Sequence, residues 1–297
     1  MVDVSDLKSY LDRRSAQVDG ALDRWLPSAR TAPATIHKAM RYAIFAGGKR
    51  LRPVLCLAAA EACGGEVEPA LPAACAVEVM HTYSLVHDDL PCMDDDDLRR
   101  GRPTCHKVFG EGMAVLCGDA LLTEAFALLG RAQPTKRHPV RELVAELAHT
   151  GGSRRLIGGQ VMDLEGEGRP LTKRQLVRIH EAKTAALLTC SLRLGAMSAN
   201  ANPAKLEALS RFGHALGLAF QVIDDILDVT QSTEMLGKTA GKDAAVAKAT
   251  YPAILGLERS RKEAARLTAE AMVALDSFRA KAVRLRQIAG YLLEREY

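Results

Sequence analysis

Two clusters of aspartates carry the clearest chemical signal in this chain. The first consists of Asp88, Asp89 and Asp94. The second consists of Asp224, Asp225 and Asp228. Carboxylates this close repel one another unless positive charge lies among them. Pairs of hard oxygen ligands suit Mg²⁺, which proteins hold through one or two carboxylates and the phosphates of a substrate. The two clusters therefore predict facing Mg²⁺ sites that clamp a diphosphate.

The surroundings of each cluster bear on whether it is merely an acidic surface. Asp95 to Asp97 extend the first cluster beyond what a metal site requires, so a solvated face is an equally good interpretation of them. Asp224 and Asp228 lie four residues apart in a segment whose apolar residues recur every three or four. With Gln221 they form a polar stripe beside an apolar helix face. Polar groups placed against a core need partners or a ligand.

Basic residues lie in positions that suit phosphate. Lys49 and Arg52 belong to a turn that opens with Gly47-Gly48, where the backbone can approach a ligand closely. The turn could equally be a helix end with basic residues that complement the helix dipole. Arg99 and Arg100 directly follow the first acidic run, and adjacent arginines repel. Either a surface salt-bridge network or a diphosphate clamp would hold the pair.

Three further positions carry weaker signals. His81 lies seven residues before Asp88 on the same helix face, which favours a hydrogen-bond donor to phosphate, although a lone helical histidine is commonly structural. Lys183-Thr184 falls at an expected helix break, where backbone carbonyls lose their partners and could stabilise a cation. A Gly- and Ala-rich segment that suits a loop closing over phosphates contains Lys238, Lys242 and Lys248.

Composition narrows the class of fold and partner. Of the 297 residues, 48% are hydrophobic and 26% are charged, which is ordinary for a globular protein. Aromatic residues are only 4%, which favours helix over strand. The net charge of +4 comes without a basic stripe interleaved with aromatics, so no nucleic-acid partner is expected. Seven scattered cysteines, an acidic N-terminus and the lack of a long apolar run predict reduced thiols, no membrane span and a cytoplasmic location.

The hydrophobic periodicity predicts an all-α fold. We expect one domain over residues 1–297, a bundle of ten or more helices around a central cavity. The expected helices include residues 5–24, 34–46, 69–88, 112–130, 139–157, 172–199 with a break near Lys183, 204–229, 250–275 and 278–295. A substrate with an apolar tail would then find its apolar surroundings inside the bundle.

Together these motifs resemble those of the trans-isoprenyl diphosphate synthases, most closely the bacterial-type (2E,6E)-farnesyl diphosphate synthases. The resemblance runs from roughly Ala32 to Tyr297 and implies the isoprenoid synthase fold. The motifs that carry it are Gly47 to Pro53, His87 to Pro91 with Arg99 to Gly101, Gly159-Gln160 with Asp163, Lys183-Thr184, and Phe220-Gln221 with Asp224 to Asp228.

The resemblance implies roles for individual residues. Metal ligands are expected at Asp88, Asp94, Asp224 and Asp228, with Asp89 and Asp225 completing the catalytic clusters and three Mg²⁺ per site once diphosphate is bound. Contacts to the allylic substrate, dimethylallyl or geranyl diphosphate, are expected from Arg99, Lys183, Thr184, Gln221, Lys238 and Lys248. Isopentenyl diphosphate is expected at Lys49, Arg52, His81 and Arg100. The resemblance also implies a homodimer.

Two features bear on the length of the product. Bulk just before the first cluster limits chain growth in this family, and Tyr83 stands five residues before Asp88. With Leu90-Pro91, typical of the bacterial-type motif, it resembles the C15 pattern, although Tyr83 could be an ordinary core aromatic. Arg154 and Arg155 lie just before Gly158-Gly159-Gln160, where members of this family usually have small residues. They could narrow the cavity, form a surface pair or alter a subunit contact.

The expected activity is Mg²⁺-dependent condensation of isopentenyl diphosphate with dimethylallyl or geranyl diphosphate to farnesyl diphosphate. A geranylgeranyl (C20) synthase is the closest alternative, and Tyr83 argues against it. A terpene cyclase would carry a different second metal motif and would need no isopentenyl site. A non-catalytic synthase subunit would be expected to lack one cluster, and an acidic metal-buffering protein would not need the basic residues.

Overall fold

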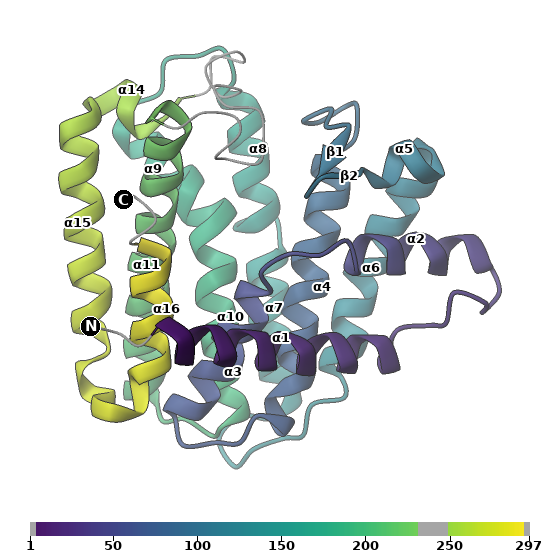
Figure 1. The fold of residues 1–297 in the computed structure, drawn as a ribbon, viewed down its shortest axis with the longest axis horizontal. Coiled ribbons are helices and arrows are strands. Elements are labelled where there is room, and N and C mark those ends of the chain that lie inside the picture. Colours follow the sequence, from purple (N-terminus) through teal and green to yellow (C-terminus); the bar gives the residue numbers. More distant parts are fainter. Residues whose placement is uncertain (1–3, 231–248, 294–297) are drawn as a thin grey trace.

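Helices form nearly the whole of the described chain (Figure 1), so the all-α prediction is confirmed. This computed structural model describes residues 4–230 and 249–293. The elements in chain order are α1 (Val4–Trp25), α2 (Ala34–Ile44), α3 (Leu51–Ala62), η1 (Glu68–Ala70), α4 (Leu71–Asp88), β1 (Leu98–Arg99), β2 (Arg102–Pro103), α5 (Cys105–Phe109), α6 (Glu111–Leu129), α7 (Val140–Gly151), α8 (Leu156–Gly166), α9 (Lys173–His180), η2 (Glu181–Ala185), α10 (Ala186–Ser198), α11 (Pro203–Thr230), α14 (Tyr251–Leu255), α15 (Leu257–Ala274), η3 (Asp276–Ala282) and α16 (Val283–Leu293). Within the described ranges, the only sheet is the antiparallel pair β1–β2, with Leu98 opposite Pro103.

The structure decides two predictions about where helices are interrupted. The single helix expected over 139–157 is wrong, because α7 ends at Gly151 and a separate helix, α8, begins at Leu156. Gly152 is extended at this break, and consecutive glycines have low helix propensity. The expected break near Lys183 is confirmed, since the π-helical turn η2 joins α9 to α10. Such π turns occur frequently at functional sites.

The core consists of two clusters of buried apolar residues that share three helices. One cluster includes Leu71, Val79 and Met80 of α4, with Leu121 and Leu128 of α6. The other includes Leu209, Phe212 and Leu216 of α11, with Leu267 and Ala271 of α15. Helices α1, α3 and α10 contribute residues to both clusters and therefore tie the two halves together.

Helix α6 corrects the expectation that no segment is long and apolar enough to cross a membrane. In the part of the chain that the structure describes, this 19-residue helix alone has that length and composition. Core helices of globular proteins share these properties, so the observation is weak by itself. Helix α6 packs along α4 and also contacts α2 and α5. Buried Leu121, Ala125 and Leu128 show that one side of it belongs to the core.

Close packing around η2 fixes the position of Lys183. An added Cβ at Gly159 of α8 would lie 2.5 Å from the Lys183 backbone nitrogen. An added Cβ at Gly217 of α11 would lie 2.5 Å from the Cα of Ala185. Two glycines therefore let α8 and α11 approach the π turn, and the obstructing atoms are backbone atoms that cannot rotate away.

This packing predicts that Gly159→Ala destabilises the fold by about 1 to 3 kcal/mol, the usual cost of overpacking a core. Urea unfolding followed by circular dichroism would measure the change. Gly112→Ala is the matched control, because Gly112 is exposed in α6 and no atom lies within 4 Å of its added Cβ. The packing interpretation is wrong if both variants unfold at the same urea concentration.

Candidate active site

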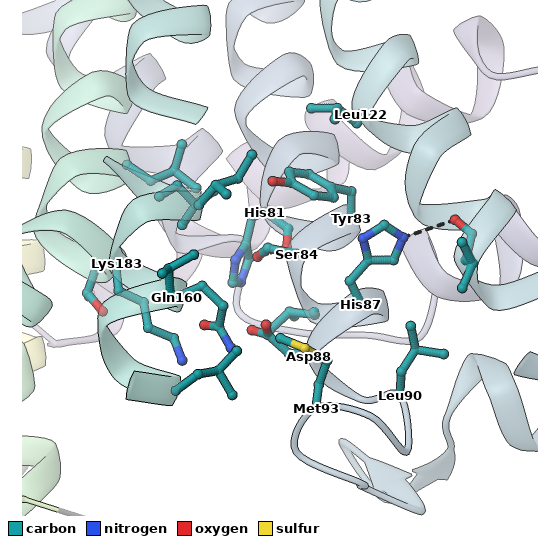
Figure 2. A pocket seen from close by; sticks show the side chains of 18 of the residues that line it. His81, Tyr83, Ser84, His87, Asp88, Leu90, Met93, Leu122, Gln160 and Lys183 are labelled. Carbon is teal, nitrogen blue, oxygen red and sulfur yellow. Dashed lines mark hydrogen bonds between the residues drawn. The ribbon is translucent and has the colours of Figure 1, made fainter. Parts of the chain in front are cut away.

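A cavity of about 620 Å³ lies between α4, α6, α8 and η2 (Figure 2). Apolar side chains form most of its wall, among them Leu85, Leu90, Met93, Val115, Leu122, Leu156, Leu164 and Leu187. Its polar lining includes five residues that the sequence predicts to act on substrate, namely Arg52, His81, Asp88, Lys183 and Thr184. Gln160 of the Gly159-Gln160 motif also lines it. The cavity therefore joins a few charged groups to a long apolar surface.

Asp88 is the predicted metal ligand that the cavity contains. Burial, with Asp94 and Asp89 close by, raises the pKa of its carboxyl to about 6, while Lys183 and Arg99 oppose the shift. The Asp94 backbone nitrogen donates to the Asp88 carbonyl oxygen at 2.8 Å, which folds the turn back on the end of α4. A divalent cation would relieve this repulsion, so the oxygen donors fit Mg²⁺.

Asp89 points to a different partner from Asp88. Its buried carboxylate accepts from Arg99 Nε at 2.6 Å, and the same guanidinium lies 3.3 Å from Asp96. Arg99 therefore fixes the loop to the end of α4, although the sequence predicts contact with substrate. Exposed Asp97 pairs with Lys107 at 2.7 Å, which matches the surface interpretation of that residue.

Lys183 and Thr184 are each held by a neighbouring helix. Lys183 Nζ donates to Asp163 Oδ2 of α8 at 2.7 Å. Thr184 Oγ1 donates to Gln221 Oε1 of α11 at 2.9 Å. The sequence motif that contains Asp163 assigns it no role, because its partner lies twenty residues away, beyond the reach of local pattern. The two bonds link α8 and α11 to the polar end of the cavity.

In the second aspartate cluster, one carboxylate has a structural partner on another element. Buried Asp225 accepts a 2.8 Å hydrogen bond from the Tyr251 backbone nitrogen, so it anchors the start of α14. Gln221, Asp224 and Asp228 recur three and four residues apart and share a helix face, which adjoins Thr184 through Gln221. None of the three aspartates lines the cavity itself. Metal binding by Asp224 and Asp228 stays a prediction.

The predicted isopentenyl site gathers positive charge. Arg52 donates to His81 Nε2 at 3.1 Å, and burial together with Arg52 and Arg100 holds the pKa of His81 well below its usual value. His81 is therefore neutral, with Nδ1 left to donate. Burial and Arg100 lower the pKa of Arg52 to about 10, and its buried Nε has no partner. An anion would satisfy that donor and offset the repulsion.

The glycines of the basic turn make room for Arg100. Its guanidinium donates to the Gly47 carbonyl and lies so close to Gly48 that an added Cβ would sit 2.5 Å from Cζ. Gly48 also has a φ of +120°, a conformation that side chains rarely adopt. Lys49 is exposed beside it. Arg52, His81 and Arg100 thus lie close together, and their binding of isopentenyl diphosphate with Lys49 stays a prediction.

The remaining predicted residues lie away from the central cavity or beyond the described ranges. Lys238, Lys242 and Lys248 lie outside the described residues. Arg154 and Arg155 are exposed and do not line the central cavity, so they do not narrow it.

Tyr83 and His87 form one side of the cavity beyond Asp88 (Figure 2). Tyr83 is 5% exposed, and its ring packs edge-on against His87 at a centroid distance of 5.8 Å. His87 Nε2 bonds to the Val115 carbonyl oxygen at 2.9 Å, and its ring packs over Gly118 of α6. Local pattern assigned no role to His87. Its bond to α6 fixes the ring that packs against Tyr83.

Arg50 holds the basic turn from inside the protein. This residue is 4% exposed and pairs with buried Glu78 at 2.8 Å and with Asp19 at 2.8 Å. It also donates to the Ile44 carbonyl at 2.7 Å. Arg50 therefore points into the protein interior. Lys49 and Arg52 are then the basic residues of this segment that can face a ligand.

We predict that Arg50→Ala lowers the free energy of unfolding by about 3 to 5 kcal/mol, because it leaves Glu78 buried without its partner. The double variant Arg50→Met/Glu78→Leu should recover most of that loss, since no buried charge remains. Chemical unfolding of the three proteins would measure the difference. Equal stability of the single and double variants would contradict this role.

Comparison with known proteins agrees with the geometry. The model of the polyprenyl synthetase family matches residues 33–285. The chain is 51% identical over 298 residues to the chloroplastic heterodimeric geranylgeranyl pyrophosphate synthase large subunit 1 of Arabidopsis thaliana, covering 98% of this chain and 80% of that protein. It is 48% identical over 294 residues to the chloroplastic geranylgeranyl pyrophosphate synthase of Capsicum annuum, covering 98% and 79%.

Solved structures agree as well. An FPP/GFPP synthase from Zymomonas mobilis has a TM-score of 0.87 and 36% identity, over 97% of this chain and 99% of that one. A geranyltransferase from Helicobacter pylori, solved with magnesium and isoprenyl diphosphate, has a TM-score of 0.82 and 36% identity, over 96% of each chain. This family uses Mg²⁺. The chain therefore belongs to the polyprenyl synthetase family and is a prenyltransferase that condenses isopentenyl diphosphate with allylic diphosphates.

Proposed function

We propose that this prenyltransferase extends its allylic starter to geranylgeranyl diphosphate (C20). The observation that carries a condensing role is the cavity in which Asp88 and Lys183 meet Arg52 and His81 at the edge of an apolar wall. The C20 length is supported by two relatives at 48% and 51% identity whose names are geranylgeranyl pyrophosphate synthases. These relatives favour the C20 alternative over the C15 product expected from the sequence.

A C15 product is the second candidate. Tyr83, packed against His87, gives the cavity a bulky aromatic wall five residues before Asp88. A relative of known structure is named a geranyltransferase, at 36% identity. The two candidates share site and chemistry and differ only in how far the growing chain extends past Tyr83.

The charged groups suit ionisation of an allylic diphosphate. Asp88 and Asp94, with Asp224 and Asp228, would hold Mg²⁺, three ions per site with diphosphate bound, and these ions would stabilise the negative charge of the leaving group. Lys183, Thr184 and Gln221 would orient the allylic diphosphate from η2 and α11. The Thr184–Gln221 hydrogen bond and the Lys183–Asp163 pair would hold these side chains in position before substrate arrives.

The basic turn suits the second substrate. Arg52 Nε and the remaining His81 ring nitrogen would donate to the diphosphate of isopentenyl diphosphate, with Lys49 and Arg100 beside them. The apolar wall would exclude water from the allylic cation and hold the hydrocarbon tail. Carbonyl groups of η2 would face the cation with their negative ends. Proton loss to the departing diphosphate would complete the step, so no protein nucleophile is required.

A homodimer is also proposed. Helix α6 has two adjacent apolar side chains that are exposed, Val115 at 42% and Leu116 at 55%. Burial of this apolar surface against another subunit would be favourable. Val115 also lines the cavity, so a partner there would help to enclose it.

The first test is a product assay. Purified protein with isopentenyl diphosphate, dimethylallyl diphosphate and Mg²⁺ should yield mainly the C20 diphosphate by mass spectrometry, and excess EDTA should abolish the yield. A dominant C15 product would select the second candidate. No condensation with either dimethylallyl or geranyl diphosphate would sink the proposed function.

Tyr83→Ala should lengthen the main product by at least one isoprene unit, because it removes the aromatic wall next to His87. Tyr83→Phe is the matched control: it keeps the ring and removes only the hydroxyl, so its products should match those of the wild type. Mass spectrometry of the chain lengths measures both. An unchanged product from Tyr83→Ala would show that Tyr83 does not limit the length of the product.

A further inference from the structure

A second cleft, also of about 620 Å³, lies against α8. Its lining includes Ser153, Arg154 and Arg155 from the break before α8, Arg178 from α9, and Glu181 and Ala182 from η2. Ile157 and Val161 of α8 border both this cleft and the central cavity. Ala182 lines the cleft, while the next residue, Lys183, lines the cavity. The two spaces therefore share a wall that carries part of the active site.

The charge in this cleft is unbalanced. The side chains of Arg154, Arg155 and Arg178 are exposed and form no ion pair or hydrogen bond with any described residue. The one carboxylate in the lining, Glu181, already bonds to His214 at 3.0 Å. Three guanidinium groups therefore outnumber the single carboxylate of the lining, and their fork of donors matches phosphate oxygens.

Not every arginine near this cleft is available to a ligand. Arg155 also borders a neighbouring cleft that contains Arg193, and Arg193 forms a two-pronged pair with Glu146 at 2.7 and 2.9 Å. Arg154, Arg155 and Arg178 line the cleft and form no such pair with a described residue.

The same cleft also presents apolar surface. Ile157 and Val161 are 40% and 46% exposed, and Met162 lies beside them in the lining. A ligand that fits both features carries several negative charges at one end and a short hydrocarbon at the other. Free phosphate or diphosphate would use only the arginines.

We infer that this cleft is a second, metal-independent binding site for a prenyl diphosphate. The hydrocarbon part of this inference rests on the proposed function, because the prenyl diphosphate is the class of compound made in the central cavity. A ligand here would contact Ile157, Val161 and Ala182 of the π turn, which adjoin the central cavity. Arg154 and Arg155 therefore serve as ligand contacts.

The test is calorimetric titration of the full-length protein with geranyl diphosphate and with inorganic diphosphate, in excess EDTA. Without Mg²⁺ the aspartate clusters cannot hold diphosphate, and all variants carry Arg52→Ala, which weakens binding at the central basic turn. The Arg154→Ala/Arg155→Ala/Arg178→Ala variant should bind geranyl diphosphate at least about tenfold more weakly, since each lost charged hydrogen bond is worth about that much. Arg174→Ala is the control, because Arg174 is exposed one turn before Arg178 and does not line the cleft.

The outcomes separate the alternatives. Undiminished binding in the triple variant would show that the cleft is not the binding site. Equal affinity for geranyl and inorganic diphosphate would show that the apolar residues of the cleft do not contribute to binding. Light scattering on the same samples detects a change in oligomeric state, which with undiminished binding would assign the arginines to a subunit contact. Because the titration requires no catalysis, arginine-dependent binding would stand even if the product assay failed, and the failure of the proposed function would be recognised separately.

Discussion

Burial of charge is the constraint on which the active site depends. Desolvation raises the pKa of Asp88 and lowers the pKa values of Arg52 and His81, so burial opposes the charged form of each group. The fold retains these groups although they cost stability without ligand. In the proposed function, Mg²⁺ would complement the acidic end and diphosphate the basic end. Ligand binding would then relieve repulsion already present in the protein, which is the condition for a preorganised electrostatic site.

Within each motif, neighbouring residues of the same type have different roles. Arg50 pairs with Glu78 inside the protein, whereas Arg52 lines the cavity. Asp89 pairs with Arg99, whereas Asp88 lines the cavity. Asp225 follows the same rule by holding the Tyr251 backbone. Arg50, Asp89 and Asp225 are each held by a partner inside the protein, so a doubled residue type in a motif does not mean a doubled function.

This division explains how far the sequence could predict the site. Local spacing placed Asp88 on a helix end, His81 on the same face and a break at Lys183, because each depends on helical periodicity alone. It could not give the partners of Asp89, Asp225 or Lys183, which come from other elements. Asp225 meets a backbone group 26 residues away in sequence. The division of residues 139–157 into α7 and α8 was missed because glycines lower helix propensity without fixing where a helix stops.

Chemistry and product length depend on different parts of the cavity. The charged groups belong to α3, the end of α4 and η2, and close packing of Gly159 and Gly217 against η2 leaves little freedom there. The wall near Tyr83 is built instead from side chains of α4 and α6, among them His87 and Leu122. Chain length can therefore diverge while the condensation is kept. Relatives at 36% and 51% identity are named for different products, FPP/GFPP and geranylgeranyl pyrophosphate, as such a separation would allow.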